Sequence, residues 1–389
     1  MRLPGTVWLI GFISLLNDSA SEMIYPLVPL YLASVLGAGP QRLGLIEGLA
    51  EATSSLFKLI SGRLMDRTGK SKPWVVAGYS LAGACRPLLS WTTSWGGVLC
   101  LRFADRLGKG LRSSPRDALL AASVEPGQRG LAFGFHRAMD NAGAVVGPLL
   151  AALLLHRGYR YQDIFTFTLV PGVLCLLLTL LLPERAPKAS PPSAAALPAP
   201  GPLPRVFWRY LGVLALFTLG NSSNMFLLLR ARQLGLSESQ VPALWAAVSF
   251  TAAVFSAPLS ALSDRYGRGR LIVGGWWAYS LFYLMLGCLS ETGGLVIFAL
   301  FSCYGLFLAA TEGVEKALVA DLAPPERLGT AYGWFHLVSG LTLLPASLLF
   351  GWFYAWGGAL PAFGFSAGCS AAAGLGMLAW VGLPGRSAR

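Results

Sequence analysis

Charged residues are scarce in this chain. They make up 12% of its 389 residues, whereas soluble proteins carry about 25%. Hydrophobic residues reach 54%, and the mean hydropathy is +0.59. This balance excludes a soluble enzyme with a water-facing surface and indicates a polytopic membrane protein.

Cysteine and histidine are also rare, with six and three copies. All six cysteines lie inside apolar segments without a CxxC or Cys/His grouping, which argues against a zinc site and a disulfide framework. His136 and His336 have no acid or cysteine partner at catalytic spacing, so we interpret them as structural. Residues 69–71 (GKS) end like a phosphate-binding loop, but Leu64 replaces the glycine that such a loop requires. The sequence therefore predicts no metal, no cofactor and no enzymatic activity.

The formal net charge is +12, but its distribution argues against a nucleic-acid partner. The basic residues cluster between apolar runs, as they do in cytoplasmic loops. With both chain ends placed inside the cell, sixteen Lys and Arg residues fall in cytoplasmic segments and five in outer loops. This asymmetry predicts a multi-pass protein of the cell (inner) membrane with both termini in the cytoplasm.

Twelve apolar runs are long enough to cross a bilayer. The first begins like a signal peptide, but its apolar character resumes through residue 35, so we interpret it as one long spanning helix. A Pro- and Ala-rich linker follows the sixth run. The predicted domains are a six-helix bundle at 1–184, a cytoplasmic linker at 185–206 and a second six-helix bundle at 207–389. The runs are 7–36, 43–65, 73–93, 95–121, 131–156, 161–183, 207–230, 239–263, 271–290, 293–320, 330–356 and 361–383.

The two halves repeat. Residues 66–70 (DRTGK) recur at 264–268 (DRYGR), and residues 130–135 (GLAFGF) recur at 329–334 (GTAYGW). Both recurrences have a spacing of 198 or 199, and each falls in the loop position that the topology requires. The sequence therefore predicts two structurally similar halves.

The fourth run carries seven charges, within residues 101–117 (LRFADRLGKGLRSSPRD). Ionised side chains are costly in hydrocarbon, so a run of this kind must line a polar cavity or pathway. At 100° per residue, six polar positions share one helix face. They are Arg102, Asp105, Arg106, Lys109, Ser113 and Arg116.

Carboxylates follow on the first two helices. Asp18 and Glu22 are one turn apart on the first helix, and Glu47, Glu51 and Lys58 share a face of the second. A carboxylate in a polar cavity can exchange a proton, and we expect Asp18, with Glu22 second, to be the carrier. The alternative is that these acids only neutralise the basic residues of the fourth run.

The second half has few embedded charges. They are limited to Glu312, Glu315 and Lys316, and the segment equivalent to the acidic part of the first helix, 221–224 (NSSN), is uncharged. We therefore expect the second half to supply apolar and aromatic cavity wall from its first, second, fourth and fifth helices.

Residues 62–72 (GRLMDRTGKSK) follow the pattern GxLxDRxGRKx, with Lys70 and Ser71 in place of the usual Arg and Lys. In this loop Asp66 can meet a helix N-terminus or an arginine, and Arg67 can hold a carboxylate. Through this motif the chain resembles the major facilitator superfamily, over essentially its whole length. The resemblance implies that the loop is a gate latch, formed by Gly62, Asp66, Arg67 and Gly69 and, in the second copy, by Asp264, Arg265 and Gly267.

Two further motifs extend the resemblance. Residues 106–110 (RLGKG) are similar to the family's RxxQG, which implies a role for Arg106 in proton coupling. Gly134, Gly143, Gly147 and Pro148 match the family's antiporter motif, although its final glycines are alanines here. Small residues at this spacing let helices approach closely, and the motif is typical of proton-coupled exporters. The alternative is ordinary glycine packing.

We therefore expect an all-α, twelve-helix carrier that exports a small organic solute in exchange for protons by alternating access. Proton-coupled uptake of an organic anion is the alternative, since the basic residues could clamp a carboxylate or phosphate. A non-transporting receptor is a remote alternative, because it should lack a continuous charged pathway. The expected partners are the solute, protons and the lipid bilayer, and the expected state is a monomer. The residues expected to line the substrate cavity are Glu47, Glu51, Lys58, Arg86, Arg102, Asp105, Lys109, Arg137, Asp140 and Asn221.

Overall fold

The computed structural model describes residues 3–36, 40–184, 202–221, 224–236, 240–290 and 293–382, without the side chains at 29, 30, 33, 34, 40–52, 225, 241 and 242. Regular structure within these ranges is helical, and no strand occurs in them. Each predicted run corresponds to one helix or to two consecutive helices, which confirms the all-α, twelve-helix prediction. In chain order these are α1 (Gly5–Ile24), α2 (Leu27–Ser34), α3 (Pro40–Thr68), α4 (Lys72–Leu88), α5 (Trp95–Ala122), α6 (Arg129–His156), α7 (Tyr161–Phe167), α8 (Leu169–Leu180), α9 (Arg205–Gly220), α10 (Asn224–Gln233), α11 (Val241–Tyr266), α12 (Arg268–Cys288), α13 (Gly294–Leu322), α14 (Leu328–Gly357) and α15 (Ala359–Gly376).

Three of the predicted runs are interrupted. The prediction of one long first helix is wrong, because Tyr25 and Pro26 separate α1 from α2 and a proline has no N–H to continue the helical ladder. Thr168 separates α7 from α8 just before Pro171. Asn221 ends α9 with non-helical dihedral angles, φ −91° and ψ 85°.

Among the described residues, seven helical segments are long and apolar enough to cross a bilayer by length and composition alone. Helix α5 is not one of them, because seven of its 28 residues are charged. Helix α5 is nevertheless part of the helical core, between α3 and α4.

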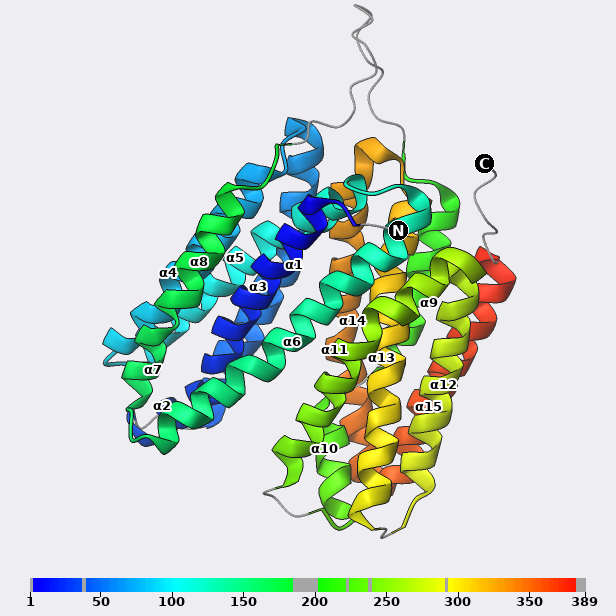
Figure 1. Ribbon diagram of the computed structural model, residues 1–389. Helices are drawn as coiled ribbons and strands as arrows, with labels where there is room; N and C mark the ends of the chain where they lie inside the picture. Colours follow the sequence, from blue (N-terminus) through cyan, green and yellow to red (C-terminus); the bar gives the residue numbers. More distant parts are fainter. Residues whose placement is uncertain are drawn as a thin grey trace, which may run out of the picture. The chain divides into compact units, whose positions relative to one another are not determined.

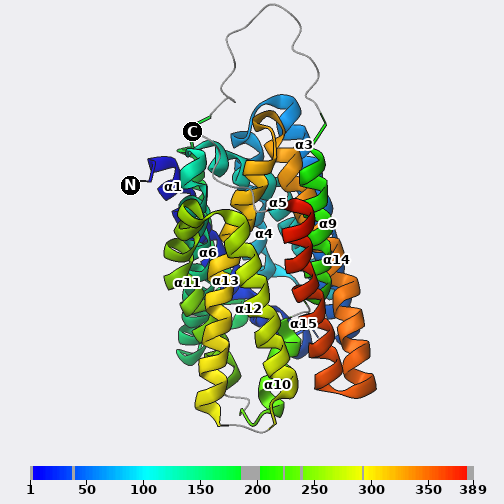
Figure 2. The same cartoon turned by 90° about the vertical axis from the view of Figure 1, so that its right-hand side faces the viewer.

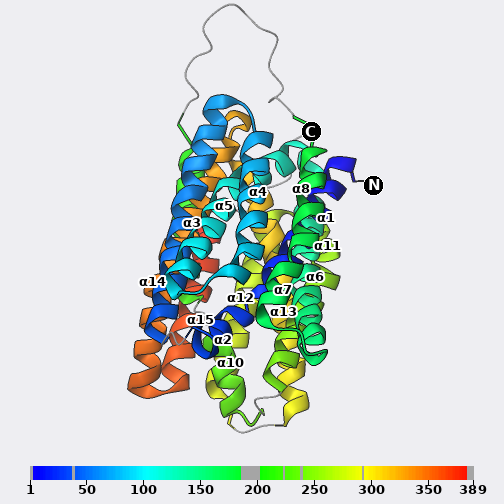
Figure 3. The same cartoon turned by 90° about the vertical axis from the view of Figure 1, so that its left-hand side faces the viewer.

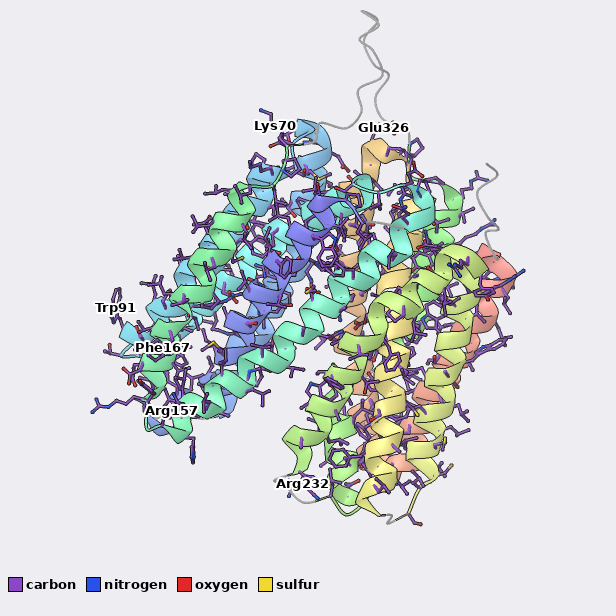
Figure 4. The ribbon with its side chains drawn as sticks, in the orientation of Figure 1. Lys70, Trp91, Arg157, Phe167, Arg232 and Glu326 are labelled. Atoms are coloured by element: carbon purple, nitrogen blue, oxygen red, sulfur yellow. The ribbon has the colours of Figure 1, made fainter. Side chains whose placement is uncertain are left out.

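The chain divides into two compact units. Unit 1 comprises Met1–Glu125, Met139–Pro202 and Pro324–Leu337. Within it α5 packs against α3 and α4, and α8 packs against α1 and α4 (Figure 3). Figure 4 shows Lys70 at one end of this unit and Trp91 and Phe167 at the other, so α4 runs between its two ends.

Unit 2 comprises Pro126–Ala138, Leu203–Ala323 and Val338–Arg389. Here α13 packs against α11 and α12, and α15 packs against α9 and α12 (Figure 2). The core is rich in aromatic rings, among them Phe217 and Trp276, which stack with centroids 4.6 Å apart. Stacked aromatic pairs add to the stability gained from burial, so these rings hold α9 against α12.

Two long helices, labelled α6 and α14 in Figure 1, each have residues in both units. Residues 129–138 of α6 belong to unit 2 and the rest of α6 to unit 1, whereas residues 328–337 of α14 belong to unit 1 and the rest to unit 2. The starts of α6 and α14, each assigned to a different unit from the rest of its helix, contain the repeated segments 130–135 and 329–334. The repeat therefore occupies equivalent places in the two units.

Candidate functional site

A buried ion cluster joins α1, α4 and α5 in unit 1. Arg86 Nε lies 3.1 Å from Asp105 Oδ1, and Arg102 Nη1 lies 3.8 Å from Asp105 Oδ2. Arg86 also donates to the backbone oxygen of Asn17 at 2.9 Å. All three charged residues are at most 5% exposed. Three expected cavity residues thus bind one another, and a buried cluster of this kind is strongly destabilised when one member is removed.

Glycines bring α4 and α5 close enough for this cluster to form. A Cβ atom at Gly78 would lie 2.5 Å from the backbone oxygen of Gly108, so any larger residue there would force the helices apart. Arg86 follows Gly78 by about two helical turns, and Asp105 precedes Gly108 by about one. The close crossing therefore positions the two ends of the ion pair.

The glycines of the antiporter motif pack α6 against α1 at the two predicted proton carriers. A Cβ at Gly143 would lie 2.8 Å from the Leu15 oxygen and 3.0 Å from Asp18 Cβ. One turn later, a Cβ at Gly147 would lie 3.0 Å from Glu22 Cβ. The structure thus places the glycines of the antiporter motif next to the acid pair of α1, two features that the sequence analysis treated separately.

Gly134, the first glycine of the same motif, belongs to a different contact. It lies in the start of α6 that is part of unit 2, and a Cβ there would lie 2.5 Å from the Ser256 oxygen of α11. Pro148 lies inside α6, directly after the α1 contact. The motif therefore serves two helix crossings, one in each unit.

The two acids on α1 have different neighbours. Asp18 accepts a hydrogen bond from Asn17 Nδ2 at 2.7 Å and interacts electrostatically with Arg112, Arg116 and Asp140. Both arginines lie on α5; Arg116 was expected on the polar face of this helix, but neither was predicted to act on Asp18. Arg112 belongs to the same charged segment of the fourth run, which is the signal that could have indicated it.

Glu22 interacts electrostatically with Arg106, Lys109 and Arg86. The predicted coupling residues Glu22 and Arg106 are thus near each other, whereas the arginines that act on Asp18 lie further along α5. Arg106 and Lys109 are both half-buried. The basic residues of α5 are therefore divided between the two acids of α1, with Arg106 and Lys109 near Glu22 and the later arginines near Asp18.

The other expected cavity residues are dispersed. Lys58 is half-buried on α3, and its backbone oxygen accepts from Ser114 Oγ at 2.7 Å. Asp140 is buried on α6 within unit 1, and Arg137 donates to Glu312 within unit 2. The side chains of Glu47 and Glu51 lie outside the described residues.

A histidine pairs with a buried acid in unit 1. His336 Nε2, near the start of α14, lies 2.9 Å from Asp117 Oδ2, and Arg116 Nη2 lies 3.0 Å from the other oxygen of Asp117. Asp117 is fully buried. The two partners are 219 positions apart in the chain, so no local spacing could have revealed the pair.

The gate motif in unit 1 caps a helix. Asp66 accepts hydrogen bonds from the backbone N–H of Gly329 at 2.9 Å and of Thr330 at 2.6 Å, at the start of α14. A carboxylate at a helix N-terminus satisfies donors that have no helical partner and meets the positive end of the helix dipole. Arg63 stacks on Trp334 at 5.3 Å. Gly62 allows the approach, since a Cβ there would lie 2.0 Å from the Gly329 oxygen.

The second copy of the motif makes equivalent contacts in unit 2. Asp264 accepts from the backbone N–H of Gly130 and of Leu131, both at 3.0 Å, at the start of α6. Arg268 adds an ion pair with Asp264 and another, at 2.7 Å, with Asp321.

The turn after each aspartate needs a glycine, because Gly69 and Gly267 have φ of +67° and +96°. Arg67 and Arg265, the motif arginines, are exposed.

In unit 2, Asn221 lies at the interruption between α9 and α10. The hydroxyl of Tyr279 donates to Asn221 Oδ1 at 3.3 Å and to the Gly220 oxygen at 3.1 Å. Tyr279 and Trp276 are fully buried, so these rings form the interior of unit 2. Within the described residues, no group of three His, Cys, Asp or Glu side chains is placed to hold a metal ion.

A family model described as Major Facilitator Superfamily matches the chain at residues 7–229 and 210–389. The chain belongs to this superfamily. This superfamily member is 35% identical over 362 residues to an uncharacterized MFS-type transporter of Methanocaldococcus jannaschii. The matched residues cover 91% of this chain and 89% of the relative. It is 25% identical over 341 residues to Multidrug resistance protein MdtH of Aeromonas hydrophila, covering 86% of this chain and 84% of that protein.

Solved structures agree on the fold. The crystal structure of the human organic anion transporter MFSD10 (TETRAN) matches with a TM-score of 0.75 and 18% identity, covering 96% of this chain and 100% of that one. At this identity the likeness shows the fold alone. The family match and the curated relative show that the chain is a multi-pass membrane transporter of the major facilitator type.

Proposed function

We propose that this transporter exports a small organic solute in exchange for protons by alternating access. The observation that carries the proposal is the crossing of α1 and α6, where Gly143 and Gly147 lie directly against Asp18 and Glu22. A proton that binds to either acid changes the charge at the point where these helices touch. Protonation and helix packing are therefore linked at one place.

The basic neighbours give this site its chemistry. Asp18 interacts electrostatically with two cations, Arg112 and Arg116, and with one acid, Asp140, so the charge balance around it depends on all three. A solute that alters this balance on binding would compete with the proton for the site. We assign proton binding to Asp18 first and to Glu22 second, with Arg106 acting on Glu22.

The two helix caps supply the conformational part of the proposal. A carrier that alternates must form and break whole sets of contacts, and the bonds of Asp66 and Asp264 to the starts of α14 and α6 are suited to this. We propose that these contacts latch one state of the transport cycle.

The name of the MdtH relative supports export of an organic solute. The alternative, proton-coupled uptake of an organic anion, is favoured by the half-buried cations Arg106 and Lys109. We further propose that the chain works as a monomer in the inner membrane with both ends in the cytoplasm. Tags in the linker at 185–206 and at Arg389 should report the same cytoplasmic side, and a periplasmic signal from either would contradict this topology.

The test is solute flux in proteoliposomes driven by an imposed pH step, with solutes first selected by thermal shift on purified protein at two pH values. Wild type should accumulate solute on the side from which protons leave. Asp18→Asn and Glu22→Gln should each reduce the flux, and the double variant should abolish it. Full pH-driven flux in both single variants and in the double would remove α1 from the coupling mechanism. If solute moves in the same direction as the protons, the transporter is a symporter and the proposed exchange is wrong.

A further inference from the structure

Glu315 differs from Asp18 and Glu22, because no basic residue acts electrostatically on it among the described residues. It is half-buried on α13 in unit 2, and its Oε1 accepts a hydrogen bond from Trp276 Nε1 at 2.9 Å. No Lys, Arg or His of the described residues forms an ion pair with it. By contrast, Asp105, Asp117 and Glu312 each pair with a basic side chain.

The internal repeat shows how this difference arises. Residues 116–119 (RDAL) align with residues 315–318 (EKAL) at the spacing of 199. In unit 1 the first position is Arg116, which pairs with Asp117. In unit 2 the acid comes first and the base second, so Glu315 occupies the place of an arginine. Unlike Arg116 and Asp117, the consecutive residues Glu315 and Lys316 do not form an ion pair with each other in the described part of the chain.

The groups that face Glu315 are neutral or negative. From α12 it meets the indole N–H of Trp276, a fully buried ring that stacks on Phe217 of α9. From its own helix it meets Glu312, one turn earlier. Arg137, at the start of α6, pairs with Glu312 and forms no ion pair with Glu315. One neutral donor is thus the entire hydrogen-bonded support for the ionised form of Glu315 among the described residues.

We propose that Glu315 is a proton-binding site of unit 2, in addition to the acids on α1. A carboxylate that no cation neutralises is ionised only at a cost inside a membrane protein, and binding one proton to a carboxylate oxygen removes that cost. Its partial exposure leaves a route for the proton, and the side chain of Glu312, one turn earlier and 32% exposed, extends that route. In transport this role rests on the proposed proton coupling, but proton binding itself can be measured without a solute.

The experiment is pH-difference infrared spectroscopy of the full chain in lipid, with protons as the only ligand. Wild type should show a carboxylic C=O band that appears as the pH is lowered. Glu315→Gln should lose one component of this band. Glu326→Gln, which changes an exposed acid at the end of unit 1 (Figure 4), is the matched control and should keep that component. An unchanged band in Glu315→Gln would overturn the proposal.

A second variant, Trp276→Phe, tests the proposal independently in case Glu315→Gln does not fold. Trp276→Phe keeps an aromatic ring but removes the N–H that supports the ionised carboxylate. The component assigned to Glu315 should then titrate about one pH unit higher. An unshifted midpoint would overturn the assignment. If the band behaves as expected but wild type shows no pH-driven flux, the proton site stands and the proposed antiport fails.

Discussion

The contact of Asp66 with the start of α14 allows a quantitative prediction. Its carboxylate accepts two backbone N–H groups, from Gly329 at 2.9 Å and from Thr330 at 2.6 Å. Asp66→Asn keeps one neutral acceptor oxygen in nearly the same volume, whereas Asp66→Ala keeps none. Asp66→Asn therefore removes only the charge, whereas Asp66→Ala removes the whole helix cap.

The expected magnitudes follow from hydrogen-bond energies. A bond to a charged acceptor contributes about 1.5–3 kcal/mol and a neutral one about 1 kcal/mol. Asp66→Asn should therefore weaken the contact by about 1–2 kcal/mol, since asparagine is itself a good N-cap. That corresponds to an opening of the α14 start that is about 5–30 times more frequent. Asp66→Ala should add about a further tenfold, because it leaves both N–H groups without an acceptor.

Amide hydrogen exchange measures this opening directly. A peptide covering 326–334 should exchange faster in the order wild type, Asp66→Asn, Asp66→Ala, and a peptide covering 126–134 serves as the internal control. Lys70→Gln, which changes an exposed cation nearby, should leave both peptides unaffected. Transport should fall in both Asp66 variants at nearly unchanged amounts of inserted protein. Equal exchange in all four proteins, or normal transport by Asp66→Asn, would refute the latch.

Three further predictions concern unit 1. Gly143→Ala should lower flux and reduce the free energy of unfolding by about 1–3 kcal/mol through overpacking, whereas Gly212→Ala, with no atom within 4 Å of the added Cβ, should not; equal melting curves would contradict this. Asp105→Asn should cost about 3–5 kcal/mol in thermal unfolding because Arg86 loses its buried carboxylate partner, and an unshifted Tm would count against the cluster. Asp18→Asn should retain solute binding, lose accumulation against a gradient and flatten the pH dependence of binding, so a wild-type pH profile would exclude Asp18 as the carrier.

The fold was largely predictable because apolar length and internal repetition are local properties of the sequence. The exceptions have local causes that hydropathy does not register. Pro26 lies within an apolar run, yet it lacks the N–H that a continuous helix requires. The interruption at Asn221 likewise lies within a predicted span.

The candidate site was predictable only in part. Asp18 and Glu22 were found because they are one turn apart on one helix. The pairing of Arg86 with Asp105 and of His336 with Asp117 depends on which helices cross and at what height, and a single sequence does not contain that information. Glu315 was visible in the sequence as an embedded acid, but only the structure shows that its neighbours include no cationic partner among the described residues.

The two copies of the gate motif also differ in a way that can be tested. In unit 2, Arg268 supports Asp264 and binds Asp321 and the backbone oxygen of Pro126, so several bonds hold the start of α6. In unit 1 the repeat places the exposed Lys70 at the position of Arg268, and Ala122 at that of Asp321, so Asp66 acts without this support. In wild type, amide exchange should therefore be faster at residues 329–330 than at 130–131. The opposite order would mean that the charges around Asp264 do not stabilise its helix cap.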